Sequence, residues 1–226
     1  MNRKALIVLN ALSSRKGLLA LKTLTWIACL SPFLWLLYCA ATNTLGPDPT
    51  KTITFTTGTA TLEILLISLA ITPVRRLSPH LAWLIKFRRL LGLFVFFYAS
   101  LHLLTWMGLY CGFQPDAMLG DIVKRRYVTA GMAAWLLMLP LAATSTNWAI
   151  RKMGGKNWTR LHRLVYIAAI AGIIHYWWLV KPGVLSPLQE TSILALLLLV
   201  RPVQVWLQHR KKTAARAANS PATVGG

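Results

Sequence analysis

Residues 90–111 read LLGLFVFFYASLHLLTWMGLYC and contain no Asp, Glu, Lys or Arg. An apolar run of about 20 residues is long enough to cross the hydrocarbon core of a bilayer as an α-helix. Further apolar runs predict spans at about residues 18–41, 53–73, 127–144, 161–180 and 185–207. We therefore predict an all-α membrane protein built as a bundle of six transmembrane helices.

The composition agrees with this fold class. The chain is 56% hydrophobic and only 13% charged, whereas a soluble domain carries roughly 25% charged residues. A net charge of +20 would suggest nucleic-acid binding in a soluble protein. Here the basic residues cluster between the apolar runs, as they do in loops that face anionic cytoplasmic lipid. We expect contact with membrane lipid and no nucleic-acid partner.

The distribution of basic residues predicts the topology. If the N-terminus is cytoplasmic, the inner segments carry 20 of the 25 Lys and Arg residues, and the outer segments carry Lys51, Lys124, Arg125, Arg126 and Lys181. Cytoplasmic loops are enriched in this way, so both termini are predicted to be cytoplasmic. The expected organisation is an N-terminal segment over 1–17, a transmembrane domain over 18–207 and a disordered tail over 208–226. The outer segments hold four of the five acids, and we expect them to form the partner-binding face.

Ionisable residues within a span are costly and therefore candidates for function. His102 lies 13 residues beyond Arg89, and His175 lies 12 residues beyond Arg163. At 1.5 Å per residue both stand about 18 to 20 Å from the inner interface, on helices predicted to be parallel. Two histidines at one depth can supply both axial ligands of a haem iron. The alternative is that each is a hydrogen-bonded packing residue.

The other candidates are less specific. His162 lies at the inner end of the predicted fifth span, with no histidine at its depth on the third, so it could bind iron, bond a propionate or cap an interface. Arg88, Arg89 and Arg163 suit haem propionates or a flavin phosphate at the inner face, or they only set topology. Glu63 could contact a quinone or a proton, or pair with an arginine.

The three cysteines, Cys29, Cys39 and Cys111, have no metal-binding or haem-attachment spacing. We interpret them as apolar helix residues, with a Cys39–Cys111 disulfide as the alternative.

Several stretches in one order resemble a known family. They are RRLLGL at 88–93, ASLHL at 99–103, LHRLVY at 161–166 and IHY at 174–176, with LW at 34–35, TG at 57–58, ITP at 71–73 and TST at 144–146. Together they closely resemble the MsrQ (formerly YedZ) family. Its members are the haem-binding membrane subunits of the bacterial MsrPQ protein-methionine-sulfoxide reductase system, with a ferric-reductase-like transmembrane domain. The resemblance extends from the first predicted span to the sixth.

The resemblance implies a function. Such a subunit would lie in the inner membrane of Gram-negative bacteria, bind one or two b-type haems and FMN, and take electrons from the quinone pool or a cytosolic flavin reductase. It would pass them to MsrP, a periplasmic molybdopterin enzyme that reduces methionine sulfoxide in oxidised proteins. The three family histidines map onto His102, His162 and His175, whereas Glu63 matches no family motif. The chain would thus be an electron-transfer subunit rather than the catalytic reductase.

Two other readings stay open. Relatives that oxidise NADPH carry a nucleotide-binding domain after the last span, but no GxGxxG fingerprint follows Leu207. We therefore expect a lipid-soluble donor or a separate reductase. The first alternative is a stand-alone transmembrane ferric or cupric reductase. The second is a transporter or scaffold without redox chemistry, although the discontinuous helices and inverted repeats typical of transporters are not apparent.

Overall fold

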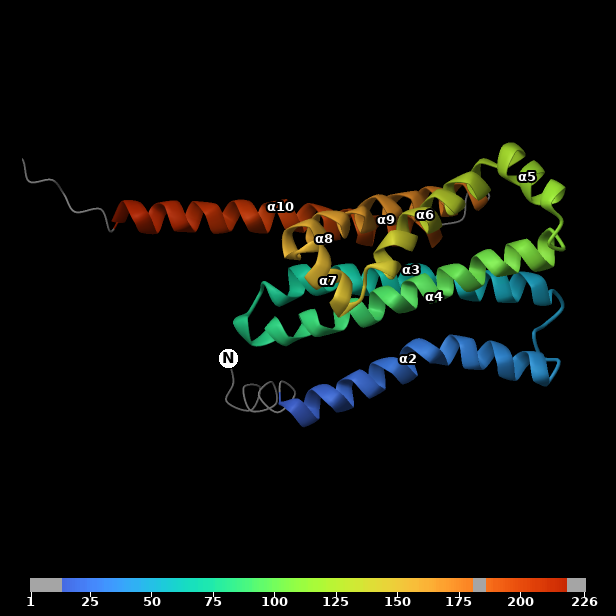
Figure 1. Cartoon of the computed structure of the whole chain (residues 1–226), viewed down its shortest axis with the longest axis horizontal. Coiled ribbons are helices and arrows are strands. Elements are labelled where there is room, and N and C mark those ends of the chain that lie inside the picture. The colour runs from blue at the N-terminus through green and yellow to red at the C-terminus, as the bar shows by residue number, and fades with distance from the viewer. Residues whose placement is uncertain (1–13, 181–185, 219–226) are drawn as a thin grey trace, which may run out of the picture.

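The structure is a computed structural model that describes residues 14–180 and 186–218. Within these ranges every regular element is helical (Figure 1), which confirms the all-α prediction. Some predictions lie outside the described residues. They concern the first part of the N-terminal segment, the expected turn at 181–183 with Lys181, the start of the sixth span at 185, and the tail beyond 218.

The first two helices, α2 (Arg15–Ala41) and α3 (Pro49–Arg75), begin at side-chain caps. The Ser14 hydroxyl accepts a hydrogen bond from the Gly17 amide at 3.1 Å, and the Asp48 carboxylate accepts one from the Lys51 amide at 2.9 Å. Proline is favoured directly after such a cap. Asp48 and Pro49 therefore start a helix, and α3 begins earlier than the predicted residue 53.

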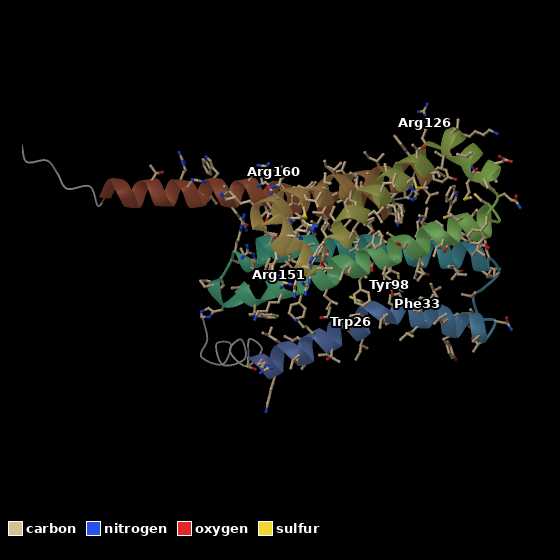
Figure 2. All side chains as sticks on the ribbon, in the orientation of Figure 1. Trp26, Phe33, Tyr98, Arg126, Arg151 and Arg160 are labelled. Atoms are coloured by element: carbon tan, nitrogen blue, oxygen red, sulfur yellow. The ribbon has the colours of Figure 1, made fainter. Side chains whose placement is uncertain are left out.

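The third helix, α4 (Arg88–Thr105), is preceded by the 3₁₀-helix η1 (Pro79–Phe87) and continues into a π-helical turn, η2 (Trp106–Tyr110). A tyrosine locks α4 to α2 at the proline of α2. Tyr98 is 0% exposed, and its hydroxyl accepts from the Phe33 amide at 3.1 Å and donates to the Cys29 carbonyl at 2.6 Å. Because Pro32 disturbs the helical ladder, the Tyr98 hydroxyl bridges the two backbone groups that would otherwise pair (Figure 2).

The second half of the chain contains α5 (Pro115–Lys124), α6 (Arg126–Ala143), α7 (Asn147–Met153), α8 (Gly155–Leu161), α9 (Leu164–Leu179) and α10 (Ser186–Ala218). The two stretches expected to be loops, 112–126 and 147–160, are thus largely helical. The chain turns at 162–163 between α8 and α9, so α9 starts later than the predicted residue 161. Helix α10 includes residues 208–218, where we had expected a disordered tail.

Among the described residues, five helices are long and apolar enough to cross a membrane: Arg15–Ala41, Pro49–Arg75, Pro79–Tyr110, Arg126–Ala143 and Pro187–Leu207. The chain is therefore a multi-pass membrane protein. Helix α9 has 16 residues and a length of about 24 Å, which is less than the roughly 30 Å core of a bilayer. The sixth span remains a prediction. Figure 1 shows the start of α2 and the far end of α10 at the same end of the bundle, as an even number of crossings requires.

The packing follows from this membrane setting. A buried core, which includes Leu69, Val95 and Ala169, joins α3, α4 and α9. The outer side of α2 exposes large apolar side chains such as Leu24 and Ile27, which would be a liability in water but match lipid. All three cysteines are buried and free, so the alternative of a Cys39–Cys111 disulfide is wrong. Cys29 and Cys39 are helix residues as interpreted, whereas Cys111 follows η2 and its thiol donates to the Asp121 carboxylate at 3.9 Å.

Candidate functional site

His102 is fixed by the neighbouring helix α3. Its Nδ1 lies 3.0 Å from the Thr54 carbonyl oxygen and 3.3 Å from the Thr57 hydroxyl. A carbonyl can only accept, so Nδ1 carries the hydrogen and Nε2 keeps its lone pair. Gly58 lies one helical turn beyond Thr54, and a Cβ there would come 3.1 Å from Cε1 of the ring. The imidazole therefore packs against the backbone of α3 at Gly58, where there is no side chain.

His175 on α9 is held in the same way by α6. Its Nδ1 lies 2.6 Å from the Tyr127 carbonyl oxygen, which again leaves Nε2 as the free acceptor. Gly131 follows Tyr127 by one helical turn, and a Cβ at Gly131 would come 2.8 Å from the ring Nδ1. Residues four apart lie on one face of a helix. A backbone carbonyl and a glycine four residues later thus position a histidine ring, and this arrangement occurs twice.

The two histidines lie together. Their ring centroids are 5.9 Å apart, with the ring planes at 88°, and both rings line one cavity of about 280 Å³. A neutral imidazole nitrogen can bind a transition-metal ion, and the two rings are close enough to share one ligand in the cavity. The structure thus brings His102 and His175 together as their predicted depths suggested.

The number of protein side chains that could bind a metal ion limits the kind of cofactor. In the described part of the chain, no three His, Cys, Asp or Glu side chains are placed to hold a metal ion. A haem iron takes four ligands from the porphyrin and needs only the axial pair from the protein. The cavity wall is mostly apolar, with Phe55, Leu62 and Met138 among its residues, as expected for a site that holds a large flat cofactor.

Charged groups stand at the rim of the cavity. Arg125 pairs with Asp121 at 3.1 Å and donates to the Tyr127 hydroxyl at 2.9 Å. The bond to Tyr127, followed by the charge of Asp121, raises the pKa of Arg125. Asp121 also accepts from the Trp106 indole at 3.2 Å, which ties α5 to the end of α4. Arg125 thus remains a fixed cation beside the cavity.

Two acids also line the cavity. Glu63 is exposed at the middle of α3, and among the described residues it forms no ion pair with an arginine, the alternative offered for it. Glu190 on α10 has a buried Oε2 with no hydrogen-bond partner. The sequence reasoning had placed Glu190 in an outer segment only.

The structure separates the other predicted site residues from this pair. His162 follows the last residue of α8 and stacks on Trp158 at 3.8 Å, and its Nε2 lies 3.1 Å from the Thr144 hydroxyl. It does not line the cavity. Arg89 donates to the Asn147 side chain, and Arg163 is exposed. Arg88 is half-buried and lies near His162. The residues predicted to form one site at the inner face therefore make separate local contacts.

Sequence reasoning missed four residues that seat the histidines: Thr54, Gly58, Tyr127 and Gly131. The stretch TG at 57–58 was noted only as part of a family pattern. A glycine four residues after a backbone carbonyl that accepts from a histidine is a signal, but it can be recognised only when the facing helix is known.

Comparisons with known proteins identify the family of the chain. The family described as the ferric reductase like transmembrane component matches residues 50–173. A protein of Herminiimonas arsenicoxydans is 46% identical over 207 residues, which cover 91% of this chain and 94% of that protein. One of Ralstonia nicotianae is 48% identical over 163 residues, or 72% and 75% of the two chains. One of Xanthomonas euvesicatoria is 42% identical over 215 residues, or 92% and 96%. All three are named protein-methionine-sulfoxide reductase heme-binding subunit MsrQ. No solved structure matches the chain.

Proposed function

Because the chain belongs to the ferric reductase like transmembrane family, among the haem-binding subunits of protein-methionine-sulfoxide reductase, we propose that His102 and His175 are the two axial ligands of one b-type haem. The observation that carries this proposal is the pair of Nδ1–carbonyl bonds, to Thr54 and Tyr127. Metal-binding histidines almost always donate their second nitrogen in this way, which fixes the tautomer and the ring orientation.

The surroundings of the pair also suit a haem. Gly58 and Gly131 leave room for the rings, and the apolar wall of the cavity excludes water. Arg125 at the rim is a fixed cation of the kind that binds a propionate carboxylate. When bound, a haem supplies a one-electron carrier whose potential depends on its ligands, burial and hydrogen bonds. The residues of this chain hold and orient the group.

We further propose the direction of electron flow. The ligand pair lies about 18 to 20 Å from the predicted inner interface, and hence in the outer half of the membrane. Electrons would enter from a quinol or from a separate cytosolic flavin reductase and leave toward a periplasmic reductase such as MsrP. The membrane would be the bacterial inner membrane. His162, Arg89 and Arg163 would serve a second, inner haem or the phosphate of FMN, whereas Arg88 lies toward Arg75 and Arg201.

Replacing the ligands tests the haem proposal. We expect His102→Ala and His175→Ala each to remove the low-spin haem spectrum of the purified protein, because no other histidine lines the cavity. His80→Ala is the matched control, since His80 is exposed on η1. A full low-spin spectrum in both ligand variants would refute the assignment. Loss of that spectrum in His162→Ala alone would also refute it.

A stand-alone ferric or cupric reductase is the second candidate, and the name of the matching family favours it. It would use the same haem and differ only in its acceptor. Reoxidation of the reduced protein should separate the two. We expect the periplasmic methionine sulfoxide reductase to oxidise the haem faster than ferric or cupric chelates do, and the reverse order would support the alternative.

The outer segments, including α5, would form the docking face for that acceptor. Helix α5 carries Asp116 and Asp121, and through Asp121 it reaches Arg125 at the rim of the cavity. A cross-linker placed on α5 should therefore capture the periplasmic reductase in membranes. Cross-links confined to η1, at the other end of the bundle, would contradict this placement.

A further inference from the structure

A cluster of arginines, with no acidic partner among the described residues, lies at the end of the bundle opposite to α5. Arg75 and Arg76 end α3, Arg88 starts α4, and Arg201 lies on α10. We call these four residues the arginine cluster. Arg88 is close enough to Arg75 and Arg201 for their positive charges to repel. Four cations have thus been gathered where helices from distant parts of the sequence meet.

These side chains have unused donors. Among the described residues, eight buried side-chain nitrogen or oxygen atoms have no hydrogen-bond partner. Seven of the eight lie at this end: one nitrogen of each of the four arginines, the Trp83 indole nitrogen, the Thr72 hydroxyl and the Gln204 amide oxygen. Buried polar groups in folded proteins are nearly always paired, and an unpaired group indicates a missing water or ion. Six of these seven can donate a hydrogen bond, which points to an anion.

No side chain of the protein can be that anion. The chain has five acidic residues, and all of them lie elsewhere. Asp48 caps the other end of α3, Asp116 and Asp121 lie on α5, and Glu190 lies near the start of α10. Glu63 precedes Arg75 by 12 residues, a distance of about 18 Å along α3. None of the acidic side chains therefore supplies the counter-charge.

The cluster is held in place by a defect of α3. Pro73 has no amide hydrogen, so the Leu69 carbonyl lacks its usual helical partner. Arg201 fills that position, because its Nη2 lies 2.6 Å from the Leu69 oxygen. Arg201 also donates to the Tyr166 hydroxyl and lies over that ring, 4.6 Å from its centroid. One face of the guanidinium is thus anchored, and its Nε remains unpaired.

The position of the cluster indicates which anion binds. It lies where α3 ends and α4 begins, which is the headgroup level of a membrane-spanning pair. Helix α10 completes the cluster and exposes Leu196 and Leu199 on its outer surface, so the cluster borders on lipid. Basic pockets between helix ends bind the headgroups of anionic lipids, and guanidinium groups bind phosphate through paired hydrogen bonds. We propose that the arginine cluster binds the headgroup phosphate of an anionic phospholipid.

Native mass spectrometry of the delipidated, haem-loaded full chain tests the proposal. We expect one phosphatidylglycerol to bind saturably, and phosphatidylcholine to bind about tenfold more weakly. The double variant Arg75→Gln/Arg76→Gln should weaken phosphatidylglycerol binding about tenfold or more, because each lost charged hydrogen bond contributes about that factor. The matched control is Arg151→Gln/Arg160→Gln, which removes two exposed arginines of α7 and α8 (Figure 2) and should change binding less than twofold.

Other ligands that carry a phosphate or carboxylate would give different results in this experiment. Titration of the wild type with FMN or inorganic phosphate needs no variant, and the proposal fails if either displaces the lipid at lower concentration. It also fails if the double variant binds phosphatidylglycerol like the wild type. Loss of haem from that variant would assign the anion to a haem propionate instead. Lipid binding does not depend on His102 or His175, so the haem proposal stands or falls separately.

Discussion

The closest contact in the histidine pocket makes Gly131→Ala the sharpest perturbation. The new methyl would lie 2.8 Å from His175 Nδ1 and 3.1 Å from Cε1. Ordinary contact begins near 3.4 Å, so the ring would have to retreat by about 0.6 Å. It cannot do so freely, because the same Nδ1 is held 2.6 Å from the Tyr127 carbonyl. The methyl therefore strains the ring position, the hydrogen bond or both.

The expected magnitude follows from that conflict. Overpacking a close-fitting site by one methyl costs about 1 to 3 kcal/mol. If the cost falls on the ligand-competent position of His175, haem affinity should drop by about 5- to 150-fold. Gly58→Ala should have a smaller effect of the same kind, since its Cβ would lie 3.1 Å from Cε1 of His102. We expect both variants to lose haem faster to apomyoglobin, and Gly131→Ala to show a changed low-spin signal in electron paramagnetic resonance.

Gly92→Ala is the matched control. Gly92 lies on α4, the helix that carries His102, but it is exposed, does not line the cavity, and a Cβ there meets nothing within 4 Å. Alanine is also the better helix former by about 1 kcal/mol, so this variant should keep its haem and its thermal stability. The reasoning is refuted if Gly92→Ala releases haem as fast as Gly131→Ala does. It is equally refuted if Gly131→Ala retains wild-type affinity and spectrum.

Three further predictions concern other parts of the molecule. Tyr98→Phe removes the hydroxyl that bridges two backbone groups at the kink of α2, so we expect a loss of about 1 to 3 kcal/mol, seen as a lower thermal midpoint. The exposed Tyr38→Phe should leave that midpoint unchanged. His162→Ala should keep the outer low-spin haem and alter at most an inner haem or flavin signal, and complete loss of haem would contradict this. A cytoplasmic reporter at Gly226 should be active and one within α5 inactive, and a periplasmic signal at Gly226 would overturn the topology.

Much of the fold was predictable because membrane insertion depends on local composition. The run at 90–111 must form a helix in lipid, since every backbone polar group has to pair within the segment. The same reasoning located α2, α3, α6 and α9 to within four residues at each end, but it ended the last span at 207, whereas α10 continues to Ala218. It also placed His102 and His175 at one depth, because the rise per residue of a helix is constant. It erred at Asp48–Pro49 and at 162–163, where a cap and a turn rather than hydropathy set the helix boundaries.

Partners across helices were not predictable, because the positions that meet are far apart in the sequence. The Thr54 carbonyl reaches His102, and the Tyr127 carbonyl reaches His175, each across 48 positions. No repeat was visible in the sequence, yet the two histidines are seated by the same register of carbonyl and glycine. The two sites are equivalent in a backbone carbonyl and in a missing side chain. Neither feature can be recognised from the amino-acid composition of the segment.

The sequence by itself determined the membrane class, the depth of the two histidines and the excess of positive charge. Only the tertiary structure decided which nitrogen of each histidine is left free, and which arginines face one another without a counter-charge. The physical reason is that burial in lipid is a property of each segment, whereas hydrogen bonding and charge pairing depend on rotation about helix axes and on contacts between helices. Arg201 illustrates both parts: the sequence placed it within the predicted last span, and only its contact with the Leu69 carbonyl made it part of the arginine cluster.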